Sequence, residues 1–443
     1  MTTLRVAWLF ARRGADDRST VLLPVIAFAV SSLLLLVVAG GALAFFSWRD
    51  GDAFIYQELA VIALALLVVP LVGLGGSAAR LSARRRDDRL AGLRLLGASP
   101  AMVAALTVIE STGLAVVGTI AGVVLYLPVA PLVGLIPFRG EPLGAAAVLH
   151  PGGVALAVLG VAVLAAASAA LGLRSVVVSP LGVRTRQAAP RVHWVRALVA
   201  AVVVAATFLV MGALQVFGGA LIVLTVLGIG FGGTIAVLNL VGPWVLRMIA
   251  SGQARRATTA RRLLAARAVL ESPKAAWRQV SGVAMTSFMA VFAGVGVGIL
   301  GMAGDGGDDQ SRTLLADIRT GVVVTVIVSF LMVACSAGVN QAAAVLDRRD
   351  LYVSLDRIGM PVGEMDAARS RAVMSPLRVT TIGSALTAAI VVFPLAGLSL
   401  LVAPLTLLMV AACLAAGVLL VWAALRATRP VLRHVLAETS PSL

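Results

Sequence analysis

The chain has 443 residues, of which 60% are hydrophobic and 13% are charged. A soluble globule of that length needs more polar residues to cover its surface, so the composition excludes a soluble enzyme and predicts an all-α, polytopic membrane protein. The formal net charge of +16 does not indicate nucleic-acid binding, because the basic residues are spread among the apolar runs and aromatic residues make up only 5% of the chain.

Ten runs of apolar residues are each long enough to cross a bilayer, which takes about 20 residues in an α-helix. The first run is longer than the apolar core of a cleaved signal peptide, which is about 7 to 15 residues, so we expect it to remain as a span. The ten predicted spans are residues 20–47, 55–79, 101–134, 152–174, 195–217, 220–245, 281–303, 321–345, 372–397 and 401–425.

The positions of Arg and Lys predict the orientation of these spans. If the N-terminus lies in the cytoplasm, 32 of the 36 Arg and Lys residues fall in cytoplasmic segments, and only Arg49, Arg139, Arg312 and Arg319 fall outside. An excess of basic residues marks the cytoplasmic loops of membrane proteins. We therefore expect a multi-pass protein of the cell membrane with both termini in the cytoplasm.

The second and third predicted spans are joined by an arginine-rich segment, residues 80–97. Its leucines leave one helical face apolar, which predicts a short amphipathic helix on the membrane surface. Gly97 permits the left-handed backbone that ends a helix. Ser99 is a typical N-cap for a following helix, and the first turn of that helix tolerates Pro100. We therefore expect a surface helix that turns sharply into the third span.

The same segment returns 262 positions later, in residues 347–359, between the eighth and ninth predicted spans. A lipid anchor gains nothing from a carboxylate at the same place in both copies, whereas a helix that docks on a protein can use it. We therefore interpret both copies as docking helices. The residues that recur like for like are Arg86, Asp88, Leu93, Leu96 and Gly97 in the first copy, matched by Arg348, Asp350, Leu355, Ile358 and Gly359 in the second.

This repeat predicts a duplicated architecture in which two four-helix halves flank an extra pair of spans. We expect a first four-helix repeat at residues 1–190, a two-helix linker hairpin at residues 191–255 and a second four-helix repeat at residues 256–443. About ten transmembrane helices are then arranged as four, two and four, with two amphipathic helices on the cytoplasmic side.

The sequence predicts neither a metal site nor a nucleotide site. The chain's single lysine, Lys274, lacks the preceding glycine and the following Ser or Thr of a phosphate-binding loop, so any ATP is hydrolysed by another chain. Cys335 and Cys413 each lie within an apolar run and are interpreted as small buried hydrophobic residues. Asp305, Asp308 and Asp309 lack the ligand pattern of a calcium loop, and we expect a solvated acidic turn there.

The chain resembles the FtsX/MacB-like permeases of ABC transporters, specifically their ten-span duplicated branch. The resemblance is carried by the arginine-rich run into Asp88, by residues 93–99 (LRLLGAS), by Glu110, and by Pro180 and Arg184 after the fourth span. It implies a membrane permease without an ATPase site of its own, which moves a hydrophobic, lipid-like, drug or antimicrobial-peptide substrate. The large outer domain typical of that branch is missing, since residues 304–320 have the length of a connecting loop.

The resemblance also implies partners and coupling residues. Each amphipathic helix is similar to the element that docks on one ATPase, so one chain would serve two ABC ATPase subunits, which bind the ATP and Mg²⁺; no cofactor is expected on this chain. The implied ATPase-coupling residues are Arg85, Arg86, Asp88, Arg89, Leu93, Arg94, Leu96 and Gly97 in the first copy and Arg348, Asp350, Leu355, Arg357, Ile358 and Gly359 in the second.

Glu110 lies inside the third predicted span. A carboxylate in the membrane costs free energy and commonly has a function. Glu110 is only about 10 residues from the cytoplasmic edge, so we favour a structural hydrogen bond to a neighbouring helix or arginine over ion translocation. Two alternative functions are an ion-driven secondary transporter and a non-transporting membrane signal transmitter. The first needs titratable groups near the middle of the membrane, and the second needs a partner within the membrane because the outer loops are short.

Overall fold

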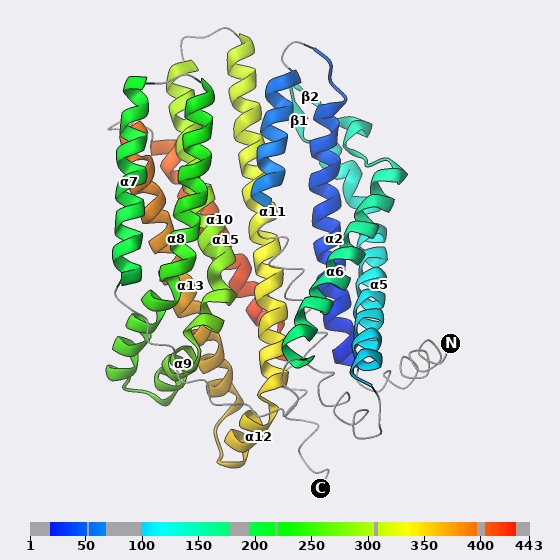
Figure 1. The fold of residues 1–443 in the computed structure, drawn as a ribbon, viewed down its shortest axis with the longest axis vertical. Coiled ribbons are helices and arrows are strands. Elements are labelled where there is room, and N and C mark those ends of the chain that lie inside the picture. The colour runs from blue at the N-terminus through cyan, green and yellow to red at the C-terminus, as the bar shows by residue number, and fades with distance from the viewer. Residues whose placement is uncertain are drawn as a thin grey trace. The chain divides into compact units, whose positions relative to one another are not determined.

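The computed structural model describes residues 18–50, 53–67, 99–177, 195–217, 220–304, 309–396 and 404–430. These residues form long α-helices and one short β-hairpin (Figure 1). In chain order the elements are α2 (Arg18–Phe46), a helix at Ala53–Leu67, α5 (Pro100–Gly134), β1 (Pro137–Phe138), β2 (Glu141–Pro142), the 3-10 helix η2 (Gly144–Ala147), α6 (Pro151–Val177), α7 (Val195–Phe217), α8 (Ala220–Arg255), α9 (Ala260–Glu271), α10 (Pro273–Gly304), α11 (Asp309–Asp347), α12 (Arg349–Arg357), α13 (Val362–Ala396) and α15 (Pro404–Ala427).

Eight of these helices are long and apolar enough to cross a membrane, namely α2, α5, α6, α8, α10, α11, α13 and α15. The chain is therefore an all-α, multi-pass membrane protein, as its composition predicts. Two further apolar helices, Ala53–Leu67 and Leu198–Val210 within α7, are shorter over the described residues and fall in the second and fifth predicted spans. The count of ten spans and the arrangement of four, two and four helices stay predictions.

The stretch between the seventh and eighth predicted spans is mostly helical, so the expected loop is wrong. α11 begins at Asp309 and includes the residues up to 320 that were expected in the outer connection. Asp309 lies in the first turn, where a carboxylate interacts favourably with the helix dipole. The hydroxyls of Thr313 and Thr320 each donate to a carbonyl one turn earlier. Polar residues extend this helix beyond its apolar part, which hydropathy alone does not reveal.

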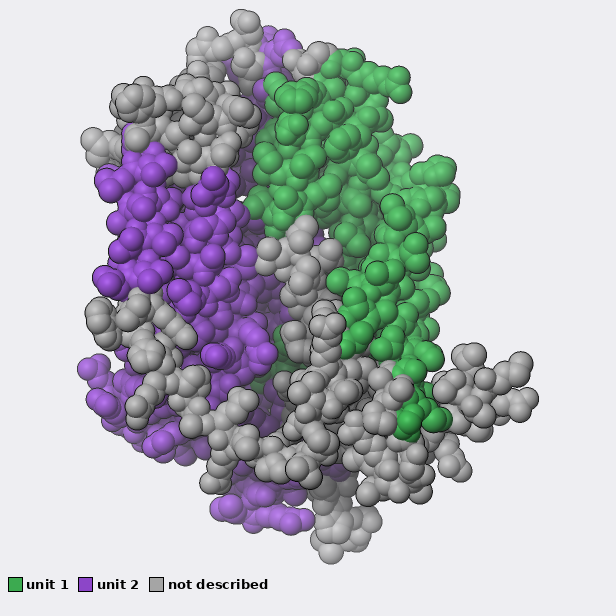
Figure 2. Space-filling view, viewed as in Figure 1, with its two compact units in different colours: residues 1–185, 338–343 green, residues 186–337, 344–443 purple. Residues whose placement is uncertain are grey.

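Contacts within the chain divide it into two compact units (Figure 2). Unit 1 comprises residues 1–185 and 338–343, and unit 2 comprises residues 186–337 and 344–443. The division at residue 185 falls near the predicted boundary at residue 190. The predicted linker hairpin, residues 191–255, lies in unit 2 together with most of the second repeat.

In unit 1, α2 packs along α5 through small residues. A Cβ atom added at Gly122 of α5 would lie 2.5 Å from the carbonyl oxygen of Ala29, so no side chain fits there. A Cβ atom added at Gly118, one turn earlier, would lie 2.8 Å from the carbonyl oxygen of Val25. Ser32 donates a 3.1 Å hydrogen bond to Thr119 across the same contact. Small residues four apart let transmembrane helices approach closely, and here they join the first and third predicted spans.

A hairpin in unit 1 fixes Arg139, one of the few arginines expected outside the cytoplasm. β1 and β2 are joined by Arg139 and Gly140, whose φ angles of 55° and 80° form a tight left-handed turn. The Arg139 guanidinium lies 4.1 Å from the ring centre of Trp48 and 4.7 Å from that of Tyr56, and it pairs with Asp50 at 2.9 Å. Stacking and charge together hold a residue whose backbone is otherwise unfavourable.

In unit 2, α10 is the central helix and contacts α8, α13 and α15. Its core contact with α13 joins Phe288 and Val291 to Ala388 and Val392, all of them buried. Phe231 of α8 packs against the same cluster, with its ring 5.3 Å from that of Phe288. These contacts bring the predicted linker helix α8 and the spans of the second repeat into one body.

Trp277, in the first turns of α10, also joins this helix to α8. The indole N–H of Trp277 donates a 3.0 Å hydrogen bond to Oδ1 of Asn239. The ring lies against Gly242, where an added Cβ atom would come within 2.2 Å of it. Only glycine allows this approach. The part of α8 around Asn239 and Gly242 and the beginning of α10 are therefore held together, and α9 lies between them in the chain.

Candidate functional site

The second arginine-rich segment forms a separate short helix, α12, between α11 and α13. Asp350 lies in its first turn and Arg357 in its last turn. Both charges complement the helix dipole, which favours carboxylates at the start of a helix and guanidinium groups at the end. The predicted amphipathic helix at residues 347–359 is thus present. The dipole also gives Asp350 a structural reason to stand where it does, independent of any partner.

Gly359 ends α12 as the sequence predicts for a glycine at this point. Its φ angle of 89° lies in the left-handed region that other residues avoid. The Met360 N–H donates to the Leu355 carbonyl at 3.0 Å, and the Gly359 N–H donates to the Asp356 carbonyl at 2.8 Å. These two bonds form a Schellman motif, which satisfies the last carbonyls of the helix and reverses the chain into α13.

The inner face of α12 is apolar and packs against unit 2. Tyr352 and Leu355, three residues apart, contact a cluster formed by Val345 of α11 and Met365 of α13, which are 0% and 2% exposed. Met360 joins the same cluster, as expected for a Schellman motif, in which the residue after the glycine packs back onto the helix. α12 is therefore seated on the ends of two membrane-crossing helices.

The apolar stripe of α12 is only partly covered, and its exposed edge lies beside the packed Leu355. Leu351 is 50% exposed and Ile358 is 82% exposed, and their spacing of seven positions places both on one side of the helix. Asp350, Ser354 and Arg357 are exposed beside them. A compact apolar patch with charged neighbours is typical of a surface that binds another protein.

The predicted coupling residue Arg348 has an intramolecular partner. Its Nη2 atom donates to Oε2 of Glu271 at 2.9 Å, which joins the start of α12 to the end of α9. A weaker pair, Arg261 with Glu364 at 3.9 Å, joins α9 to the start of α13. Both pairs are partly exposed and contribute little to stability. They nevertheless fix how α12 and α13 are oriented on α9.

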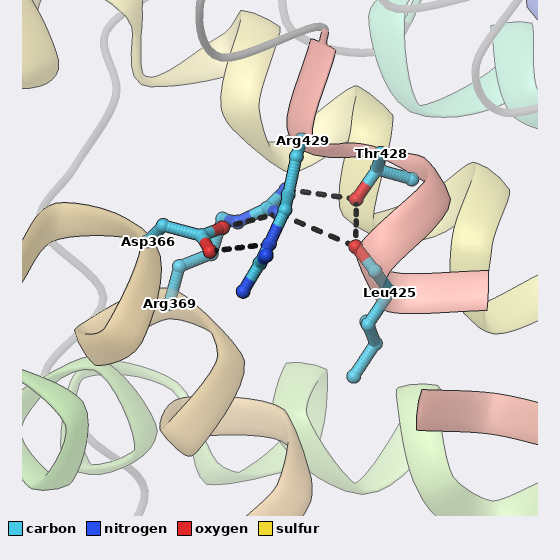
Figure 3. Close-up of polar contacts among 5 residues, drawn as sticks. All are labelled: Asp366, Arg369, Leu425, Thr428 and Arg429. Atoms are coloured by element: carbon cyan, nitrogen blue, oxygen red, sulfur yellow. Dashed lines mark hydrogen bonds and ion pairs between the residues drawn. The ribbon is translucent and has the colours of Figure 1, made fainter. Parts of the chain in front are cut away.

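A buried charge network joins the beginning of α13 to the end of α15 (Figure 3). Asp366 of α13 accepts from Nη2 of Arg369 at 2.8 Å and from Nε of Arg429 at 2.7 Å, so each carboxylate oxygen has its own arginine. Arg369 also donates to the Thr428 hydroxyl at 2.9 Å and to the Leu425 carbonyl at 3.4 Å, at the end of α15. Its side chain is only 2% exposed. The network therefore ties α13 to α15.

Tyr352 links the inner face of α12 to this network electrostatically. Burial raises the pKa of the Tyr352 hydroxyl above its ordinary value of 10.0, while the positive charges of Arg369 and Arg348 oppose that rise and Asp366 adds to it. These charges act on Tyr352 only because they lie close to it. α12, the buried network and the pair with α9 therefore form one connected end of unit 2.

The first copy of the segment lies outside the described residues. Its expected coupling residues are Arg85, Arg86, Asp88, Arg89, Leu93, Arg94, Leu96 and Gly97. The description resumes at the start of α5. Ser99 caps this helix by accepting a 3.2 Å hydrogen bond from the Met102 N–H, and Pro100 occupies the first turn, as predicted. Glu110 lies on α5 with an exposed side chain.

Among the residues that the structure describes, no group of three or more His, Cys, Asp or Glu side chains could hold a metal ion. The fold and this site define a multi-pass, α-helical membrane protein in which a short, partly apolar helix packs at one end of unit 2. No protein-family model matches the chain, and no curated protein matches it.

Proposed function

We propose that the chain is the permease subunit of an ATP-driven ABC export system in the cell membrane. α12 docks on one ATPase subunit, and the segment at residues 80–97 docks on a second, so that one chain serves two ATPases. The partner subunits bind and hydrolyse ATP with Mg²⁺. The substrate is hydrophobic, such as a lipid, a drug or an antimicrobial peptide, and both termini lie in the cytoplasm.

The observation that carries this proposal is that the apolar stripe of α12 is packed against unit 2 along one edge and exposed along the other. Ile358 and Leu351 offer apolar contact area, and Asp350 and Arg357 offer charges that orient a partner. An exposed loop could bind a partner equally well, but a loop would deform and would not transmit the partner's movement. α12 transmits it, because Tyr352 and Leu355 pack against α11 and α13.

The same contacts give a path for movement from the partner to the membrane. A push on α12 acts on Val345 and Met365 and therefore directly on α11 and α13. Through Asp366 and Arg369 it also acts on the end of α15. Three membrane-crossing helices would then move with one docking helix, which is what coupling of ATP hydrolysis to transport requires.

The proposal is tested by purifying the chain from its native membrane with its associated proteins. We expect two ATPase chains for each permease chain, measured by mass in detergent. Ile358→Asp should reduce the retained ATPase by at least about tenfold, because it places a charge in the apolar part of the contact. Leu135→Asp is the matched control, since Leu135 is 67% exposed and lies in unit 1, beyond the far end of α5.

Two results would contradict the proposal. One is a permease that leaves its native membrane stable and without any ATPase. The other is an Ile358→Asp variant that retains as much ATPase as the control. Two permease chains with two ATPases would leave the class intact but refute the idea that one chain presents both docking helices.

A further inference from the structure

A second surface of unit 2 lies on α9 and takes no part in the docking by α12. α9 connects α8 to α10, and the apolar parts of these helices end at Arg255 and begin at Pro273. The chain therefore leaves the membrane just before α9 and re-enters it just after. In Figure 1, α9 lies level with the end of α8, whereas α12 extends further from the helix ends. α9 is thus placed at the membrane surface.

One face of α9 is fixed to protein and the other is not. Ala265, Ala266 and Val269 are buried against unit 2, where α9 contacts α8 and α13. On the other side Leu263 and Leu264 are 42% and 38% exposed. At 100° per residue, Arg267 lies between these two leucines on the helix surface. The uncovered face thus combines apolar side chains with a guanidinium group.

The surroundings of this face are strongly basic. Residues 255–278 contain seven basic residues and a single acidic one, Glu271, which is paired with Arg348. All seven basic side chains are exposed: Arg255, Arg256, Arg261, Arg262, Arg267, Lys274 and Arg278. Such a cluster attracts anionic headgroups near the membrane surface.

We propose that the exposed face of α9 binds anionic phospholipid headgroups, with Leu263 and Leu264 inserted among the upper acyl carbons. Helices that lie in the interface have this composition, with apolar residues facing the bilayer and Arg or Lys at the headgroups. An acidic protein surface would explain the arginines equally well. The level of α9 at the end of α8, with α12 standing further out, favours the lipid (Figure 1).

The test is direct binding of lipid to the purified full chain. The chain is delipidated in detergent, and bound phosphatidylglycerol or phosphatidylcholine is counted by native mass spectrometry. Arg267→Gln should weaken phosphatidylglycerol binding by about fivefold, because one charge near the headgroups is removed. Phosphatidylcholine binding should stay unchanged. The matched control removes one exposed arginine of α12, Arg349→Gln, and should retain phosphatidylglycerol.

A second variant separates the lipid site from a general charge effect. Leu263→Ser with Leu264→Ser keeps every charge and should still reduce phosphatidylglycerol binding, because the inserted apolar area is lost. The proposal is overturned if the α9 arginine variant binds phosphatidylglycerol as the unmodified chain does, or if the α12 control loses as much. It is also overturned if the α9 variant keeps its lipid but loses a co-purifying ATPase, since the face would then serve protein docking.

Discussion

The helices that come after the two arginine-rich segments, α5 and α13, begin in similar ways but carry different polar residues. Ser99 caps α5, and the Pro361 carbonyl accepts the N–H groups of Glu364 and Met365 at the start of α13. In α13 the next turns contain Asp366 and Arg369, which bind Arg429 and the end of α15.

The first copy cannot form that network. The positions 262 residues before Asp366 and Arg369 hold Ala104 and Thr107, while Glu110 corresponds to Ala372. The start of the membrane-crossing helix is thus similar after both segments, but the polar residues in its next turns are not. The repeat in sequence therefore does not extend to these polar contacts. If both segments bind ATPases as proposed, we expect the two contacts to differ in strength for that reason.

The largest expected effect comes from removing Arg369. Arg369→Met leaves Asp366 buried with only Arg429 as its partner, and breaking a buried pair costs about 3 to 5 kcal/mol. Thermal unfolding in detergent should show a marked loss of stability. Arg371→Met is the matched control on the same helix, because Arg371 is exposed, and it should change stability by no more than about 0.5 kcal/mol. Equal unfolding temperatures for the two variants would show that the buried network does not stabilise the fold, so it would not distinguish α13 from α5.

A smaller loss of stability is expected from a change at Gly359, which ends α12. Gly359→Ala forces a Cβ atom into a left-handed backbone and should destabilise the turn by about 1 to 2 kcal/mol. Gly363→Ala is the control, since Gly363 is helical with open space around it, and alanine there is neutral or stabilising.

The same substitution at Gly97 tests whether the first copy of the segment ends as the second copy does. If the first segment ends in the same left-handed turn, Gly97→Ala should cost as much as Gly359→Ala. A Gly97→Ala variant with unchanged unfolding would mean that the repeat in sequence does not extend to the turn. Both losses are measured as shifts in unfolding temperature under one detergent condition.

The smallest effect is a dependence of stability on alkaline pH. Because burial raises the pKa of Tyr352 in the folded chain, folding favours its protonated form. Its contribution to stability is therefore fully present below the unfolded pKa of about 10 and is lost as the pH rises through the folded value. Tyr352→Phe should remove that loss. The measurement is the unfolding temperature between about pH 9 and 11, and parallel curves for both proteins would contradict it.

Hydropathy and the repeat predict much of this fold, but they do not predict its polar contacts. Long apolar runs identify membrane-crossing helices because about 20 residues must be apolar wherever the chain crosses lipid. α12 could be predicted because its pattern occurs twice and because Gly359 has a conformational role that few residues fill. The helical start of α11 was missed because polar residues form helices without leaving a hydropathy signal.

The buried network could not be predicted for a different reason. Asp366 and Arg369, three residues apart, have the spacing of an ordinary surface pair on a helix. They are buried because Arg369 contacts the end of α15, about 60 residues further along the chain. Nothing in the local sequence of either segment indicates that the two meet. Arg429 was visible in the sequence only as a basic residue beside Pro430.

The exposed Lys274, at the start of α10, gives the molecule one side-chain amine for chemical labelling, because the chain contains no other lysine. An amine-reactive dye that cannot cross lipid therefore attaches to one known point of the helical region, beside α9. In sealed vesicles the dye would reach that point from only one side. The protein thus carries an intrinsic marker of its own sidedness, which needs no engineered cysteine or tag and leaves the residues of α12 unaltered.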